Sequence, residues 1–177
     1  TSTMVAPLHV VKPATQPTTV TLGNNDKFQI SAELSSIGAG IDSVTLKKFA
    51  DVNGKGPYVF QKPYDDSGKL TRALAARSVK IGDDQVDVSN VPWHLVSSDA
   101  QSATFMLDLG VVRLRKTFAL TPTASPGEGF EMTVSQEIEN LTTKPVKVQL
   151  GTLGPTAPPR ESERSSDLQV MSAYDDG

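Results

Sequence analysis

The alternation of apolar and polar side chains between Val112 and Leu150 constrains the fold of this chain more than any other sequence feature. Successive side chains of a β-strand point to opposite faces, so a period of two predicts a strand with one apolar face. Only Lys116 interrupts the first apolar row. The apolar residues of that row are Val112, Leu114, Phe118 and Leu120, and they alternate with Arg113, Arg115, Thr117 and Thr121.

The same alternation continues in two further runs. The second run carries an apolar row of Phe130, Met132, Val134 and Ile138, and its opposite row is Glu131, Thr133, Ser135, Glu137 and Glu139. A polar turn over residues 140–144 follows, and a third run then alternates Val146, Val148 and Leu150 with Lys147 and Gln149. This pattern predicts an antiparallel meander that is packed on one face and solvated on an acidic face.

The earlier part of the chain predicts further short strands. A hairpin is expected where Val20 and Leu22 precede a turn and residues 28–34 resume the alternation. Ile41 and Val44 lie on opposite parities of the next strand, which predicts a bulge near Asp42. Extended structure is expected beyond Arg77, and helices are expected to be short at most. With aromatic and apolar runs at 58–60, 93–95 and 103–109, the total is about eight to ten strands.

The domain organisation follows from proline content and length. Residues 1–19 contain Pro7, Pro13 and Pro17 and are predicted to form an extended tether. Residues 20–177 are predicted to form one β-sandwich domain, because a chain of 177 residues can bury roughly two-thirds of its unfolded surface. Gly154 to Pro159 is expected to be an exposed excursion, and Leu168 to Met171 is expected to start a last strand.

Composition excludes several classes of function. The chain has no cysteine, so it has neither disulfides nor thiolate metal ligands. Its net charge of −3 comes from scattered residues, without the basic cluster that nucleic-acid binding requires. No apolar run approaches the roughly eighteen residues of a membrane span, and Thr1 to Val11 lacks the pattern of a signal peptide. The predicted chain is soluble as given, with no nucleic-acid partner.

Candidate catalytic and metal-binding residues are few. His9 and His94 are the only histidines, and neither lies in a metal-binding spacing such as HxH or HExxH. No GxSxG nucleophile motif occurs. The paired aspartates, 65–66, 83–84 and 175–176, could supply calcium oxygens, but turn formation explains them better because adjacent carboxylates point apart on an extended chain. We therefore expect no catalytic, cofactor-binding or metal-binding residue, and no enzyme activity.

Four remaining motifs each have a structural explanation beside a functional one. Asn140 to Thr142 matches a glycosylation acceptor or a hairpin turn. Gly151 to Gly154 lacks the Lys-Ser/Thr of a phosphate loop and is typical of a turn that ends a strand. Arg113, Arg115 and Lys116 could face an acidic partner or pair with carboxylates of neighbouring strands. Glu131, Glu137 and Glu139 share a face that is typical of the solvated side of a sheet.

The order of these landmarks resembles the large periplasmic domain of the YidC family of bacterial membrane protein insertases. The combination of an early F-x-I, a downstream I-x-S-V-x-L, R-K-T-F-x-L and an E-N-x-T-x-x-P-V hairpin carries the likeness. The matching segments are TLGNNDKFQISAELSSIGAGIDSVTLKKF (21–49), VPWHLVSS (91–98), VVRLRKTFALTP (111–122), FEMTVSQEIENLTTKPVKVQL (130–150) and GPTAPP (154–159).

The resemblance implies an antiparallel β-supersandwich, similar to galactose mutarotase, on the periplasmic side of the inner membrane. The family inserts and folds inner-membrane proteins, alone or with the Sec translocon, so the implied partners are Sec components and nascent inner-membrane proteins. Contact with the membrane would come only from flanking helices that this chain lacks. The family domain is usually larger, so the sandwich is expected to be incomplete at its C-terminal end. No insertion residue of the family carries over to this chain.

Two other functions share these sequence features. One is a carbohydrate- or peptide-binding β-sandwich of an adhesin or cell-envelope protein. The other is a mutarotase-like sugar epimerase, which needs an acid and a base on opposite sides of a sugar ring. His94 with one of the sheet-face glutamates is the only candidate pair for that chemistry.

Overall fold

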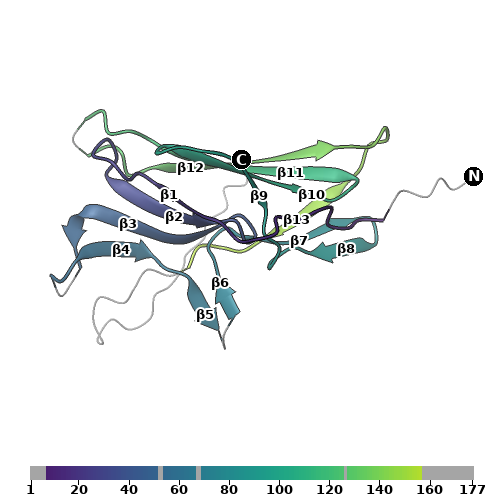
Figure 1. Cartoon of the computed structure of the whole chain (residues 1–177), viewed down its shortest axis with the longest axis horizontal. Coiled ribbons are helices and arrows are strands. Elements are labelled where there is room, and N and C mark those ends of the chain that lie inside the picture. The colour runs from purple at the N-terminus through teal and green to yellow at the C-terminus, as the bar shows by residue number, and fades with distance from the viewer. Residues whose placement is uncertain (1–6, 52–53, 67–68, 126, 157–177) are drawn as a thin grey trace, which may run out of the picture.

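The computed structural model describes residues 7–51, 54–66, 69–125 and 127–156, and within these ranges the protein is all-β. Every strand pairing is antiparallel, and no helix occurs in the described ranges. Two four-stranded sheets lie one above the other, with smaller sheets at one end and below (Figure 1). The predicted fold class, an all-β antiparallel sandwich, is therefore confirmed.

The first sheet has the order β1-β2-β3-β4. Its strands are β1 (Thr19–Leu22), β2 (Ile30–Ser35), β3 (Gly40–Ala50) and β4 (Pro57–Gln61). The predicted hairpin is the β1–β2 pair, and its apolar row from Val20 to Leu34 is buried. The predicted bulge is also present, because Glu33 pairs with Ser43 and Leu34 pairs with Ile41, which leaves Asp42 as the extra residue.

The second sheet has the order β12-β11-β10-β9. Its strands are β9 (His94–Ser98), β10 (Ser102–Asp108), β11 (Val112–Leu120) and β12 (Met132–Asn140). Every second residue of β11 is buried, so the alternation predicted for this strand is confirmed. In β12 the predicted faces are also confirmed, because Val134 and Ile138 pair with Phe118 and Leu114 on the inward side. Burial is weaker than expected there, since Ile138 is 42% exposed.

The third run of the predicted meander does not join this sheet. β13 (Val148–Thr152) instead pairs with β7 (Ala76–Ile81), which also pairs with β8 (Asp84–Asp87). The meander prediction is wrong at this step because Pro145, which lacks an N–H, and the loop around it separate the third run from β12. The prediction of about eight to ten strands is too low. The strands that it missed are very short: β8 and the hairpin of β5 (Tyr64–Asp66) and β6 (Lys69–Thr71).

The core fills the space between the two four-stranded sheets. Phe105 and Phe118 contact each other there at a ring-centroid distance of 6.2 Å with nearly perpendicular planes. Trp93, just before β9, is 1% exposed and joins the same cluster. Inward-facing side chains of both layers complete the core: Leu22, Ile30, Ala32, Leu34, Ala103, Leu107, Val112, Leu114 and Leu120. Apolar burial of this extent is the main stabilising contribution in a sandwich.

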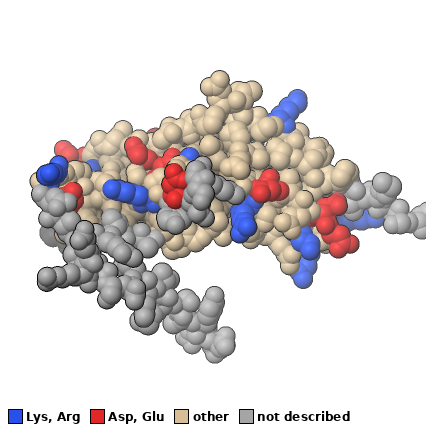
Figure 2. Space-filling view, turned by 90° about the horizontal axis from the view of Figure 1, so that it is seen from below, with Lys and Arg blue, Asp and Glu red and all other residues tan. Residues whose placement is uncertain are grey.

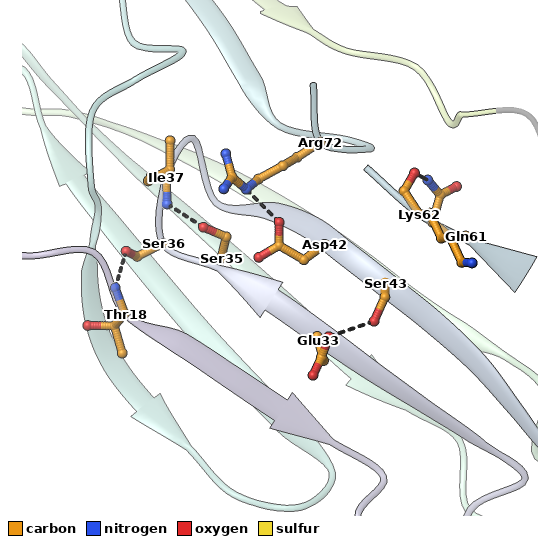
Figure 3. A network of polar contacts seen from close by, with 10 residues as sticks. All are labelled: Thr18, Glu33, Ser35, Ser36, Ile37, Asp42, Ser43, Gln61, Lys62 and Arg72. Atoms are coloured by element: carbon orange, nitrogen blue, oxygen red, sulfur yellow. Dashed lines mark hydrogen bonds and ion pairs between the residues drawn. The ribbon is translucent and has the colours of Figure 1, made fainter. Parts of the chain in front are cut away.

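The first sheet contacts the segment that leads into β7 at the place where β2 turns into β3. Arg72, just after β6, donates to the Asp42 carboxylate over 2.6 Å, so the bulge in β3 anchors the segment that leads into β7 (Figure 3). Gly40 is required at this crossing, because a Cβ there would lie 2.8 Å from the Cβ atoms of Ala75 and Arg72. The Ile41 N–H and the Leu153 N–H each donate to a backbone carbonyl of residues 73–75.

The described part of the predicted tether lies against the sandwich. The Val11 N–H donates to the Asp108 carbonyl over 2.9 Å, and the Ala14 N–H donates to the Pro92 carbonyl over 3.1 Å. Leu8 and Val10 pack against the core. Residues 9–14 are thus held along the end of the second sheet.

Candidate functional site

The rings of both histidines contact the backbone of the N-terminal segment, His9 from within the segment and His94 from the sandwich. Nδ1 of His9 lies 2.8 Å from the Pro7 carbonyl oxygen, and Nε2 of His94 lies 2.6 Å from the Lys12 carbonyl oxygen. One ring nitrogen of each histidine is therefore engaged with the backbone. Lys12 has a φ of 44°, so the His94 contact coincides with an unusual backbone conformation.

The candidate acid–base pair of an epimerase is separated across the second sheet. His94 pairs with Met106, Met106 with Arg115 and Arg115 with Glu137, so His94 and Glu137 lie in one row on one face. β10 and β11 lie between their strands, and three spacings of about 4.8 Å place the strand axes roughly 14 Å apart. His94 and Glu137 are therefore not neighbours in the sheet.

The acidic pairs do not gather into a metal site in the described residues. No group of three or more His, Asp or Glu side chains lies close enough there to hold a metal ion. Asp83 and Asp84 lie at the β7–β8 turn, where Ile81 pairs with Asp84. The pair at 65–66 lies in the β5–β6 hairpin, and the pair at 175–176 lies outside the described residues.

The outer face of the second sheet forms an open polar groove of about 480 Å³. Arg113 bridges Asp108 at 3.1 Å and Glu139 at 3.2 Å, and Arg115 lies 3.9 Å from Glu137. These contacts confirm that the two arginines pair with strand carboxylates. The Gly110 backbone N–H, helped by Arg113, lowers the pKa of Asp108 from its usual value. Val96, Ser97, Thr104 and Thr117 complete the lining, so no aromatic side chain is among the described residues that line the groove.

Lys116 occupies a different environment from the arginines beside it. It faces the core, is 1% exposed, and donates from Nζ to the Leu74 carbonyl oxygen. Nζ also lies 5.7 Å from the centroid of the Phe118 ring. Burial lowers the pKa of Lys116 to about 8. The prediction that Lys116 pairs with a strand carboxylate is wrong, because its parity places it on the inward face of β11.

An apolar cleft opens between the first sheet and the start of β12. Its volume is about 420 Å³. Phe60 and Phe130 stand at the cleft with 47% and 38% of their surfaces exposed, and Phe49 contacts Phe130 edge-on at 6.0 Å. The cleft lining is Ile30, Ile41, Val44, Leu46, Phe60, Gln61, Ala73, Leu74, Phe130, Met132 and Pro155. Apolar side chains that remain accessible in a concave site are typical of ligand or protein binding.

Sequence reasoning did not identify this cleft. Each of its residues lies in a run that predicts ordinary strand or loop. The cleft arises only where β2, β3, β4, residues 73–74, residues 130–132 and Pro155 meet. The available sequence signals were Phe60, three positions before Pro63, and Phe130, which precedes the regular part of β12.

Of the two remaining motifs, the one at Asn140 forms a turn and the one at Gly151 begins inside a strand; charged residues are dispersed. Asn140 accepts from the Thr142 N–H over 2.9 Å and donates to the Lys144 carbonyl over 2.8 Å, which closes a local turn. The turn is not that of a hairpin, because β12 and β13 do not pair. Gly151 lies within β13, where a Cβ would come 2.7 Å from the Ser78 hydroxyl. Basic and acidic residues are interspersed on the face shown in Figure 2, with no large patch of one sign among its coloured residues.

Comparisons with known proteins identify no relative: no protein family, no curated sequence and no solved structure matches this chain. Among the described residues there is no helix with the length and apolar character needed to cross a bilayer. The described part of the molecule is thus an all-β sandwich whose surface includes an apolar cleft and a polar groove.

Proposed function

We propose that this chain is a non-catalytic accessory domain of a YidC-type insertase, on the periplasmic side of the bacterial inner membrane. In this proposal it assists the insertion and folding of inner-membrane proteins, alone or with the Sec translocon, and its fold is an incomplete supersandwich similar to galactose mutarotase. The motif resemblance described above supports the family, and the apolar cleft supports the binding role.

The observation that carries the binding role is the cleft beside Phe60 and Phe130. A segment of an unfolded membrane protein is rich in Leu, Ile and Val, and its free energy falls when its apolar surface is removed from water. The cleft offers accessible apolar surface of the same kind between the first sheet and the start of β12. We infer that its ligand is an extended apolar segment of a membrane protein before insertion.

A peptide-binding titration tests this role. The probe is a fluorescent peptide of leucine and alanine, flanked by lysines and as long as one transmembrane segment. We expect Phe60→Ser and Phe130→Ser each to weaken binding about tenfold, which corresponds to about 1.4 kcal/mol. Leu95→Ser is the matched control, because Leu95 is 36% exposed but lies outside the cleft. Unchanged binding by both cleft variants, or equal binding of a polar peptide, would overturn the role.

The gene sequence on either side of this chain tests the family. An insertase has one apolar span before Thr1 and several after Gly177. An adhesin or cell-envelope sandwich has a span on neither side, and that result would reject the proposal in favour of the alternative. The epimerase alternative is tested by polarimetry with one pure sugar anomer, where acceleration that is lost in His94→Ala would reject a non-catalytic role.

A further inference from the structure

The edges of the sheets differ in how they are protected from pairing with another chain. Most edge strands have three to five residues, and three of these, β4, β9 and β13, also carry register shifts. β12 is the exception within the described ranges, with nine residues paired to β11 without a shift. It also contains no proline, lysine or arginine. Short length, bulges, proline and charged side chains, lysine above all, are the usual features that block edge-to-edge pairing, and of these β12 carries only Glu137 and Glu139.

The free backbone groups of β12 can be assigned from its bonds to the second sheet. The Thr121 N–H donates to the Glu131 carbonyl over 3.0 Å, and the Leu141 N–H donates to the Val111 carbonyl over 3.0 Å. Hydrogen-bonded pairs alternate along an antiparallel ladder, so the odd-numbered residues of β12 point their peptide groups toward β11. The even-numbered residues, from Met132 to Asn140, therefore direct their N–H and C=O groups outward along the edge.

We propose that β12 pairs with β12 of a second copy of this chain, antiparallel and about a two-fold axis at Gln136. The second sheet of one copy and the second sheet of the other then form one continuous sheet across the contact. In this register the outward peptide groups of Val134 face those of Ile138 of the second copy, and the two Gln136 residues face each other. The side chain of Ile138, 42% exposed in one copy, is then covered by Val134.

Charge selects this register over its neighbours. Centred on Gln136, the contact places Glu137 opposite Ser135 and Glu139 opposite Thr133, and no two carboxylates are opposed. A shift of the axis to Ser135 places Glu139 opposite Glu131, and a shift to Glu137 places that residue opposite itself. Like charges directly opposite each other destabilise a strand pair, so the edge is self-complementary in one register.

Disulfide trapping tests the register, and the chain is suited to it because it has no cysteine. Hydrogen-bonded pairs have Cα atoms about 5.5 Å apart, within disulfide range. We expect Gln136→Cys to form a covalent dimer under mild oxidation with copper phenanthroline. Thr133→Cys is the matched control, since its two copies would be separated by six positions along the strands, roughly 20 Å. Equal cross-linking of the two variants would overturn the register.

Sedimentation equilibrium over a concentration series tests the association without cross-linking. Ser135→Lys places an ammonium opposite Glu137 of the second copy, twice per dimer, and should tighten the dimer about tenfold. Ser135→Glu should weaken it by a similar factor. Ser97→Glu on β9, the other edge of the same sheet, is the control and should change nothing. A chain that stays monomeric throughout, or a response to Ser97→Glu equal to that of Ser135→Glu, would overturn the proposal.

Discussion

β11 and β12 are neighbouring strands of nine residues with the same alternation in sequence, yet they differ in burial. All the inward positions of β11 are buried, including Phe118 and Leu114. Of the inward positions of β12, Met132 and Val134 are half-buried, and Gln136 and Ile138 are exposed. Both strands face the same way, because each residue of β12 pairs with one of β11.

The difference teaches that periodicity determines which face a side chain occupies, whereas coverage depends on the opposite layer. β11 lies over the first sheet, whose inward residues complete its core. β12 lies at the edge, so only the residues nearest the first sheet are covered. A mutation at the same parity should therefore cost much more in β11 than in β12.

The largest effect is expected for Phe118→Ala. Phe118 is fully buried and contacts Phe105, so truncation removes apolar contacts and leaves a cavity. We expect the free energy of unfolding to fall by roughly 3–5 kcal/mol, measured by urea titration. Ile138→Ala is the matched change in β12 and should cost about 1 kcal/mol or less. The titration is done at low protein concentration to avoid self-association. Equal losses would show that burial by the opposite sheet does not distinguish the two strands.

The second prediction concerns the pH dependence of Lys116. Its pKa is about 8 in the folded chain and 10.5 without burial, so between these values the unfolded chain holds more protons. Stability therefore rises with pH across this window, by roughly 3 kcal/mol, and below pH 8 the full cost of burying the ammonium applies. Lys116→Met should remove this rise, although it leaves the Leu74 carbonyl without its side-chain donor.

The measurement for Lys116 is the free energy of unfolding at several pH values from 7 to 10.5, compared between the wild-type chain and Lys116→Met. Lys147→Met controls for the loss of one positive charge, because Lys147 lies at an exposed position. Parallel curves for the wild-type chain and Lys116→Met would contradict a buried ammonium in β11.

Features set by local pattern could be predicted from the sequence. The faces of β11 and β12 follow from alternation, and the bulge at Asp42 follows from the change of parity between Ile41 and Val44. These predictions need only the geometry of one strand and its immediate neighbour. That the chain has no catalytic residues stays a prediction, because no comparison with known proteins tests it.

Features set by distant pairing could not be predicted. β13 pairs with β7, far back in the chain, because its partner is chosen by the packing of whole sheets and not by its own pattern. The partner of Lys116 is the carbonyl of Leu74, a residue with a φ of 57° that lies far from Lys116 in the sequence. The apolar cleft likewise needs six segments to meet, so it has no signature within any one of them.

The smallest effect is expected for Glu137→Ala, on the outward face of β12. The Glu137 side chain is 73% exposed, and its nearest carboxylate oxygen lies 3.9 Å from Nε of Arg115, which is itself 41% exposed. Water screens such a pair, and ordering two long side chains costs entropy, so the loss should stay within about 0.5 kcal/mol. Arg113→Ala is the sharper comparison on the same face, because Arg113 bridges two carboxylates, and it should cost more than Glu137→Ala in the same urea titration. A loss of stability for Glu137→Ala equal to that for Phe118→Ala would mean that the outward face of β12 is buried. The contrast between the two faces of this sheet would then fail.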